Sequence, residues 1–322
     1  MTHMMILVLL VMMIISVKDI IGREFSFLYT DFCQADELSV MREYEVSRSY
    51  IAIVKDTRGN KYIIKQHKKK DVPKVDVLCV REMFGACMAE MLGIPANKVR
   101  LIPAGESVRG KPLRHRAATI HEFIEGNIHY VERTLIKKQG KNKFSLRQLY
   151  SRAPTEADYG LTLLVILSMA CHRDFPRIVA LDTFLGISDR KARNMIYDEK
   201  KDIFYFIDFD NGCMRDLCYW AAVRIKEIIK KQGSGLGKKE YVALAVYYET
   251  LKQIVDMFPP EKVDRIFQEL FEDLHMREHD DAAYYVGLCK KRMRTSYESA
   301  KKLLVVLKEL FALYSKNTGF YH

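Results

Sequence analysis

Residues 181–212 read LDTFLGISDRKARNMIYDEKKDIFYFIDFDNG, and this stretch decides which fold the sequence predicts. Asp189 is followed at a short interval by Asn194, and after a polar turn the apolar run Ile203 to Ile207 ends at Asp208. A hard cation such as Mg²⁺ prefers carboxylate, amide and water oxygens. The order therefore predicts a magnesium-assisted phosphoryl-transfer site, in which a strand presents Asp208 to the metal and a turn presents Asn194. Asp189 would orient the attacking hydroxyl.

The same stretch resembles the catalytic and metal-binding loops of the atypical branch of the protein-kinase-like superfamily. That branch includes the phosphatidylinositol 3- and 4-kinases, actin-fragmin kinase and the bacterial persistence-toxin kinases, whose loops read roughly G-x-x-D-R-x-x-x-N followed by I-D-F/N-G. The matching positions are Gly186, Asp189, Arg190, Asn194, Ile207, Asp208 and Phe209. The resemblance implies a two-lobed α+β fold, with a small antiparallel-sheet N-lobe, a mainly helical C-lobe, and ATP and Mg²⁺ (or Mn²⁺) between them.

Roles for individual residues follow from this resemblance. Asp189 corresponds to the catalytic aspartate, Asn194 and Asp208 to the metal ligands, and we expect Arg190 to brace the catalytic loop by pairing with a carboxylate or backbone carbonyls. Three positions depart from the family pattern: Lys191 in place of His, Ser188 in place of the Gly of lipid kinases, and Asp210 in place of the Gly of D-F-G. Asp210 either joins the metal ligands or marks a loop of different shape.

Upstream, Tyr50–Val54 and Tyr62–Gln66 are rich in β-branched and aromatic residues and flank the turn-forming sequence D-T-R-G-N. This pattern predicts a β-hairpin. In the resembled family a Lys at the end of the second strand pairs with the nucleotide phosphates, which implies that role for Lys65. The alternative is an ordinary surface lysine. Ser47 and Ser49 lie where a phosphate-covering turn belongs in that family, or else form an ordinary polar turn.

Apolar residues at helical spacing predict a helix over Val77–Leu92, which ends before Gly93 and Pro95. A buried ammonium needs a carboxylate partner. We expect Glu82 rather than Glu90 to pair with Lys65, because the first turns of this helix face the nucleotide in the resembled family. The alternative is that both acids are exposed.

The strand predicted over Ala118–Ile124 resembles the hinge of kinase folds. The backbone of Glu122 to Ile124 would there bind an adenine edge. This hinge gives the expected division of the chain into a leader (residues 1–22), an N-lobe with the nucleotide-binding hairpin (23–126) and a C-lobe with the catalytic and metal-binding loops (127–322).

In the C-lobe, Asp158–Ala170 is apolar on all sides and predicts a buried helix. The segments after Gly212 with helical apolar spacing are Arg215–Lys231, Lys238–Met257, Pro260–Glu272, Asp281–Thr295 and Tyr297–Tyr314. Residues 233–237, GSGLG, have no strand before them, so they are interpreted as a linker and not as a phosphate loop.

Composition limits the classes of protein that fit. In 322 residues, 49% are apolar, which excludes wholesale disorder. The 52 Lys and Arg against 41 Asp and Glu give a net charge of +11 and favour anionic partners. Seven scattered cysteines without a C-x-x-C pair indicate reduced thiols and hence a cytosolic working environment. The apolar run Met4–Val17 is an export signal or membrane anchor, a misassigned start, or a buried segment.

Together these features predict an ATP- and magnesium-dependent kinase. A Ser or Thr of a protein substrate is the first choice of acceptor, and a phosphoinositide or other small alcohol at an anionic lipid surface is the second. A nucleotide-binding pseudokinase scaffold is the third alternative. A nucleic-acid-binding adaptor is disfavoured, because its alternating aromatic and basic residues are missing from the sequence.

Overall fold

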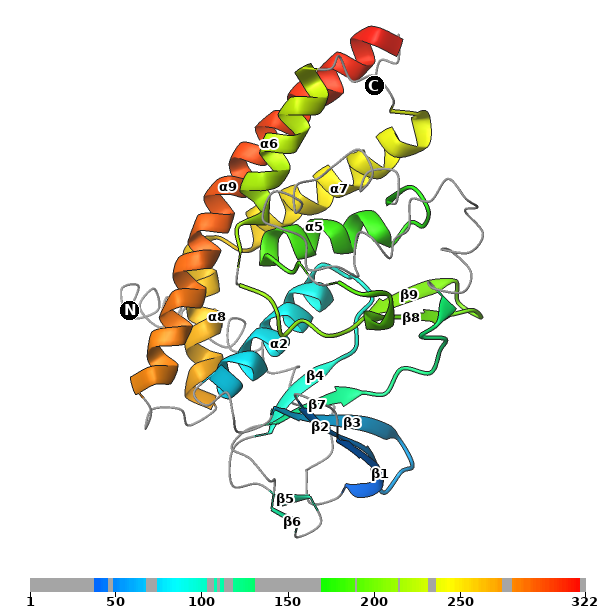
Figure 1. Cartoon of the computed structure of the whole chain (residues 1–322), viewed down its shortest axis with the longest axis vertical. Coiled ribbons are helices and arrows are strands. Elements are labelled where there is room, and N and C mark those ends of the chain that lie inside the picture. The colour runs from blue at the N-terminus through cyan, green and yellow to red at the C-terminus, as the bar shows by residue number, and fades with distance from the viewer. Residues whose placement is uncertain are drawn as a thin grey trace, which may run out of the picture.

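The computed structural model describes residues 38–45, 49–67, 74–102, 107–108, 111–112, 118–130, 169–188, 190–213, 215–230, 236–273 and 280–318. The sequence between Leu38 and Glu122 forms mostly strands, and the sequence after Met169 forms mostly helices (Figure 1). The chain thus has the two-lobed α+β fold that the sequence predicts, with an antiparallel sheet in its N-terminal part and a helical C-terminal part.

Five strands form the antiparallel sheet. They are β1 (Ser39–Glu45), β2 (Ser49–Lys55), β3 (Lys61–His67), β7 (Ala118–Glu122) and β4 (Val99–Ile102), in this spatial order. Lys65 of β3 is paired with Ile51 on one side and with Thr119 on the other. Directly paired residues in an antiparallel ladder point to the same face of the sheet, so these three side chains share one face. Two very short strands, β5 (Ser107–Val108) and β6 (Lys111–Pro112), form a separate ladder.

The two faces of this sheet have different neighbours. One face carries a small apolar cluster that includes Ala52, Val54, Tyr62, Ile64 and Ile120. Helix α2 (Lys74–Met91) packs against the sheet on the Lys65 side and also contacts the helical part (Figure 1). Its buried residues belong to the same apolar core as those of the C-terminal helices. Helix α2 therefore joins the two parts.

The C-terminal part is built from five described helices around that core. They are α5 (Phe175–Leu185), α6 (Leu217–Lys230), α7 (Lys238–Met257), α8 (Pro260–Asp273) and α9 (Asp280–Thr318). Helix α9 runs along the whole helical part and lies against α6, α7 and α8 (Figure 1). In sequence between α5 and α6, β8 (Met195–Asp198) and β9 (Ile203–Phe206) form a hairpin, which lies between α5 and the sheet in Figure 1.

One expectation about the helices is wrong: the segments Asp281–Thr295 and Tyr297–Tyr314 form a single helix, α9. Ser296 lies in its interior and is 1% exposed. No Gly or Pro separates the two apolar patterns at this point, so nothing in the sequence ends the first helix.

Several described elements have weak signals in the sequence and are additions from the structure. Helix α5 occupies the segment that leads into the predicted catalytic loop, and strands β1 and β8 precede the strands that the sequence indicates. Strands β4, β5 and β6 lie between the predicted helix and the predicted hinge strand. Other expectations concern segments outside the described residues: the leader and most of the helix predicted over Asp158–Ala170. None of the described helices combines the length and the apolar character needed to cross a membrane.

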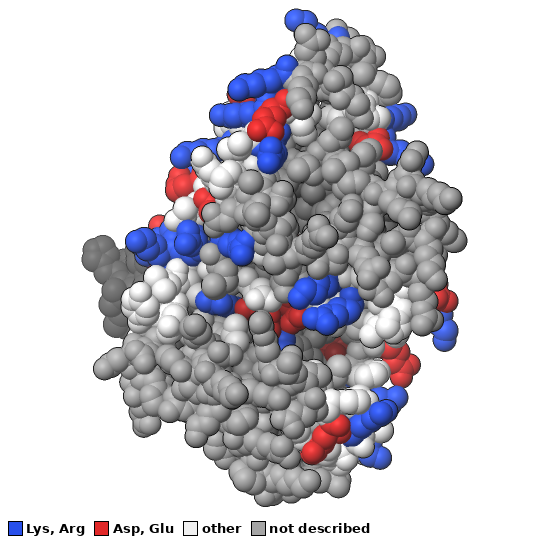
Figure 2. All heavy atoms as spheres, in the orientation of Figure 1, with Lys and Arg blue, Asp and Glu red and all other residues white. Residues whose placement is uncertain are grey.

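Basic side chains line one edge of the face seen in Figure 2, where α6 and α9 lie. Two basic residues of α9 contact α8. Lys290 donates to Gln268 at 3.0 Å, and Arg294 pairs with Asp264. These contacts help to hold the two helices together.

Candidate active site

The β8–β9 hairpin brings two predicted metal ligands together. Asn194 ends a short 3₁₀ turn (Ala192–Asn194) directly before β8, and Asp208 follows β9 by two residues. The register pairs Met195 with Phe206, so the residues just outside the ladder are neighbours too. The backbone N–H of Ile207 donates to the Asn194 carbonyl at 3.1 Å. The Asn194 side-chain amide donates to Asp208 Oδ2 at 3.0 Å.

The backbone at Asp208 adopts a left-handed conformation, with a φ of 69°. This conformation is uncommon for residues other than Gly and persists only where the surroundings fix it. Contacts of the next residue, Phe209, fix the backbone at this point. The Phe209 N–H donates to Glu82 Oε1 at 3.0 Å, and the Phe209 ring is fully buried beside Gly85 of α2. A Cβ at Gly85 would lie 2.6 Å from the Phe209 Cβ, so only glycine allows this approach.

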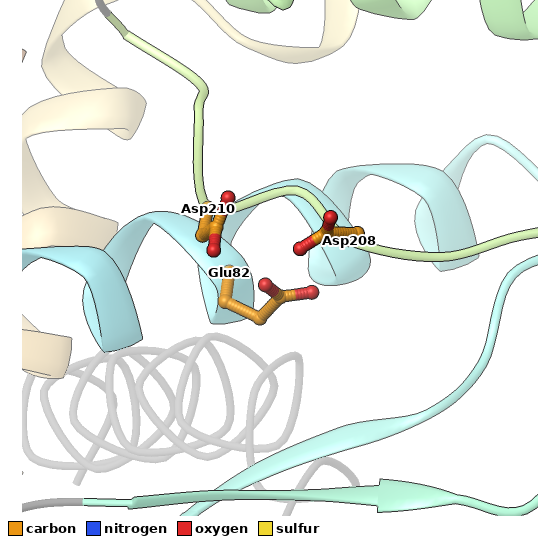
Figure 3. A group of neighbouring side chains, drawn as sticks. All are labelled: Glu82, Asp208 and Asp210. Carbon is orange, nitrogen blue, oxygen red and sulfur yellow. The ribbon is translucent and has the colours of Figure 1, made fainter. Parts of the chain in front are cut away.

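The Lys65 ammonium lies among three carboxylates. Its Nζ is 2.6 Å from Asp208 Oδ1, 2.8 Å from Asp210 Oδ2 and 3.3 Å from Glu82 Oε2. One carboxylate oxygen from each of the three acids lies within 4.8 Å of the other two, and the side chains point toward a common centre (Figure 3). Lys65 comes from the sheet, Glu82 from α2 and the two aspartates from the loop after β9, so the centre lies where three elements meet.

The charges of this centre shift the proton affinities of its members. Burial opposes the charge of Lys65, but the three acids outweigh it and raise the Lys65 pKa. Burial also opposes ionisation of Asp208, yet Lys65 and Arg190 bring the Asp208 pKa to about 2. Asp210 has the opposite balance, because burial and the charges of Asp208 and Glu82 raise its pKa to about 7. The centre thus gathers three carboxyl groups around one ammonium, and the raised Asp210 pKa is a consequence of this crowding.

Glu82, and not Glu90, is the residue of α2 that contacts Lys65. Its side chain is fully buried and its two oxygens are used separately, one by Lys65 and one by the Phe209 N–H. Burial raises the Glu82 pKa against the effect of Lys65. The carboxylate thus links the strand that carries Lys65 to the loop that carries Asp208.

Arg190 is 1% exposed and lies behind the loop. Its Nε and Nη2 donate to the two oxygens of Asp182 at 2.9 and 2.8 Å, and Nη1 donates to the Ile207 carbonyl. The guanidinium also stacks over the Phe209 ring, 4.8 Å from its centroid. Arg190 is therefore a positioning residue. It joins helix α5, through Asp182, to the backbone at Ile207, directly before Asp208. Asp182 lies on helix α5, whose residues are nearly all buried, and this position brings its carboxylate to Arg190.

A buried histidine beneath Lys65 had no signal in the sequence. His121 Nδ1 is 2.8 Å from Asn97 Nδ2, and its Nε2 is 2.8 Å from Thr119 Oγ1. Burial and the nearby Lys65 charge bring the His121 pKa to about 3, so the imidazole is neutral. The Asn97 amide donates to Nδ1, and Nε2–H then donates to Thr119. These contacts order the strand beside Lys65.

The remaining predicted positions are placed as follows. Ser49 is buried at the start of β2 on the Lys65 face of the sheet. In the predicted hinge, the Glu122 N–H donates to the Lys98 carbonyl and the Phe123 N–H donates to the Lys61 carbonyl. Ile124 comes next and is half-buried. Ser47 and Asp189 lie outside the described residues.

Comparisons with known proteins give distant likenesses in structure alone. No family model matches the chain, and no curated protein matches it. Among solved structures, the Helicobacter pylori proinflammatory kinase CtkA is similar over 89% of this chain and 98% of its own, with 12% identical residues and a TM-score of 0.45. With so few shared residues, what this chain does has to be inferred from its own side chains.

Proposed function

We propose that this protein is a kinase that transfers the γ-phosphoryl group of ATP to an alcohol oxygen with the help of Mg²⁺. One observation carries the proposal: the Lys65 ammonium contacts Glu82, 17 residues away in sequence, and Asp208, 143 residues away. A lysine from a sheet, a glutamate from the adjacent helix and an aspartate after a hairpin are the parts that hold nucleotide phosphates and metal in kinases.

The donors at this centre suit a magnesium ion. Asp208 and Asp210 supply carboxylates, Asn194 has an amide oxygen, and the crowding of three carboxyl groups around one ammonium favours a divalent cation. When bound, Mg²⁺ would neutralise negative charge on the transferring phosphoryl group. We propose Asp208, Asn194 and Asp210 as the residues that hold it.

Lys65 is proposed to bind the nucleotide phosphates. Its ammonium can donate to phosphate oxygens while Glu82 keeps it in place. On the same face of the sheet, Ile51, Ile53 and Ile63 are half-buried and offer an apolar surface for the base. Ser49 lies on this face at the end nearest residues 46–48, where it would help to cover the phosphates. We propose the backbone of the hinge around Ile124 as the adenine-binding edge.

Asp189 is proposed as the group that accepts the proton of the attacking hydroxyl. Arg190, its neighbour, is fixed by Asp182 and by the Ile207 carbonyl. This bracing supports the proposal, because it fixes the residue that follows Asp189 in the chain. Proton transfer depends on a fixed geometry between the base and the acceptor.

The proposed acceptor is a Ser or Thr side chain of a protein. To test this, the full chain is incubated with γ-labelled ATP and Mg²⁺, alone, with a protein mixture, or with phosphoinositide vesicles. We expect label on protein in the wild type and none with Asp189→Ala or Asp208→Ala. Label on lipid would make this a lipid kinase. If the wild type gives no label but ATP raises its melting temperature, the chain is a nucleotide-binding scaffold.

A further inference from the structure

A pair of buried cysteines lies beside the proposed active site and has no part in its chemistry. Cys213 ends the loop that begins at Asp208, and Cys289 lies on α9. Arg81, the residue before Glu82 on α2, reaches the same point. Three segments far apart in sequence thus converge on two sulfur atoms.

The contacts among these side chains are specific. Arg81 Nε donates to Cys289 Sγ at 3.4 Å, and the Cys213 thiol is hydrogen-bonded to the Cys289 sulfur. Cys213 is 4% exposed and Cys289 is 1% exposed. The Cys213 backbone is fixed as well, because its N–H donates to the Leu185 carbonyl at 2.6 Å. The two sulfur atoms are therefore held in contact by the fold.

The pKa values of the two cysteines are shifted in opposite directions. The hydrogen bond from Cys213 and the charge of Arg81 outweigh burial and lower the Cys289 pKa to about 6. The same hydrogen bond, together with burial, raises the pKa of Cys213. Cys87, which is buried without such partners, instead has its pKa raised to about 12. A thiolate next to a thiol is the combination that forms a disulfide once the thiolate is oxidised.

We propose that Cys213 and Cys289 form a redox-sensitive pair, which a peroxide converts into a disulfide between α9 and the end of the 208–213 loop. In the first step the Cys289 thiolate attacks the peroxide oxygen, which gives a sulfenic acid and releases water after protonation. In the second step the Cys213 sulfur attacks the sulfenic sulfur and a second water leaves. Two thiols and one hydrogen peroxide thus become one disulfide and two waters.

The test measures this crosslink directly. The reduced full chain is treated with hydrogen peroxide, the remaining thiols are alkylated, and the digested protein is mapped by mass spectrometry. We expect a peptide pair joined through Cys213 and Cys289. The half-buried Cys171 serves as the accessibility control, and Cys171→Ser should form the same crosslink at the same rate.

Arg81→Gln tests the role of the guanidinium. Removal of its charge should reduce the thiolate fraction of Cys289 at neutral pH and slow crosslinking by about tenfold. Cys213→Ala should leave Cys289 as a sulfenic or sulfinic acid, and Cys289→Ser should leave Cys213 reduced. Thermal unfolding of each variant shows whether it is folded.

Two results would overturn the proposal. One is oxidation that is confined to Cys171 or other cysteines, while Cys213 and Cys289 are recovered as alkylated thiols after unfolding. The other is an unchanged crosslinking rate in folded Arg81→Gln. Neither result depends on kinase activity, so the outcome is separate from the fate of the proposed function.

Discussion

At the scale of single residues, Lys65 is the position on which the proposed chemistry depends. Its three acidic partners come from α2 and from the loop after β9, and each is within 3.3 Å of the ammonium. Three carboxyl groups around one ammonium are what the proposed binding of a divalent ion together with an anionic ligand requires.

Asp208→Asn removes the charge of the central carboxylate but keeps its shape. We expect phosphoryl transfer to slow by about 10²- to 10⁴-fold, because transition-state charge is stabilised mainly by the metal that Asp208 would hold. The rate is measured under single-turnover conditions at saturating Mg²⁺. Asp256→Asn is the matched control, since Asp256 lies on α7 with its side chain 63% exposed and should leave the rate unchanged. Equal rates in all three proteins would remove Asp208 from the mechanism.

Asp182→Ala leaves the Arg190 guanidinium buried without its carboxylate. Loss of one partner of a buried ion pair typically costs about 3–5 kcal/mol, and we expect a loss of this size in the free energy of unfolding. Urea denaturation measures it. Glu227→Gln provides the comparison, because the Arg224–Glu227 pair on α6 is exposed and should contribute less than about 1 kcal/mol. If Asp182→Ala changes the free energy of unfolding only slightly, the buried Arg190 does not depend on the Asp182 carboxylate.

At the scale of elements, the turn between β2 and β3 holds the strand of Lys65 in register. The Asp56 side chain accepts hydrogen bonds from the Arg58 and Asn60 backbone N–H groups at 2.9 and 2.8 Å, and from the Tyr62 hydroxyl at 3.2 Å. Burial opposes the charge of Asp56, but these hydrogen bonds lower its pKa. Asp56 therefore stabilises the hairpin in its ionised form.

Asp56→Ala should lower the free energy of unfolding by about 1–3 kcal/mol at neutral pH, because it leaves turn donors without their acceptor. A lowered pKa in the folded state stabilises the protein above the unfolded value near 3.8, and this stabilisation is lost as the pH falls through the folded value. The difference between wild type and variant should thus shrink below about pH 4. Denaturation curves across this range test it, and a difference that stays constant would contradict an ionised acceptor.

Gly85→Ala places a methyl group against Phe209, which anchors the metal loop. We expect weaker nucleotide binding and a lower melting temperature, although Ala favours helices over Gly by about 1 kcal/mol. Gly287→Ala on α9 is the matched control. No atom lies within 4 Å of a Cβ at Gly287, so the helix preference alone should raise stability there. If Gly85→Ala is also stabilising, the contact between α2 and the loop is not tight.

Local sequence patterns predict some of these elements and miss others. Helix α7 has the bounds that its apolar spacing predicts, because one face is buried and the other exposed. Helix α5 is buried on nearly all sides, so its sequence shows no helical periodicity. Only Pro176 in its first turn and the C-cap residue Gly186 mark its ends. In the site, the motif spacing singles out Asp208 and Asn194, whereas the partners Asp182 and His121 depend on long-range packing that spacing does not encode.

At the scale of the whole molecule, one apolar core extends from α2 through the C-terminal helices, and the sheet is joined to it through α2 and β4. The proposed site lies where these parts meet, so the residues that bind nucleotide and those that bind metal come from different parts of the chain. A ligand that contacts both parts should stabilise the whole molecule.

Calorimetric titration of the full chain with ATP, in Mg²⁺ and in EDTA, tests the central claim most directly. We predict binding in Mg²⁺, weak or undetectable binding in EDTA, and loss of binding in Lys65→Met. Lys252→Met on α7, whose side chain is 53% exposed, should bind as the wild type does. ATP binding that is equally tight in EDTA, or equally tight in Lys65→Met, would contradict a shared metal and phosphate site at Lys65 and Asp208.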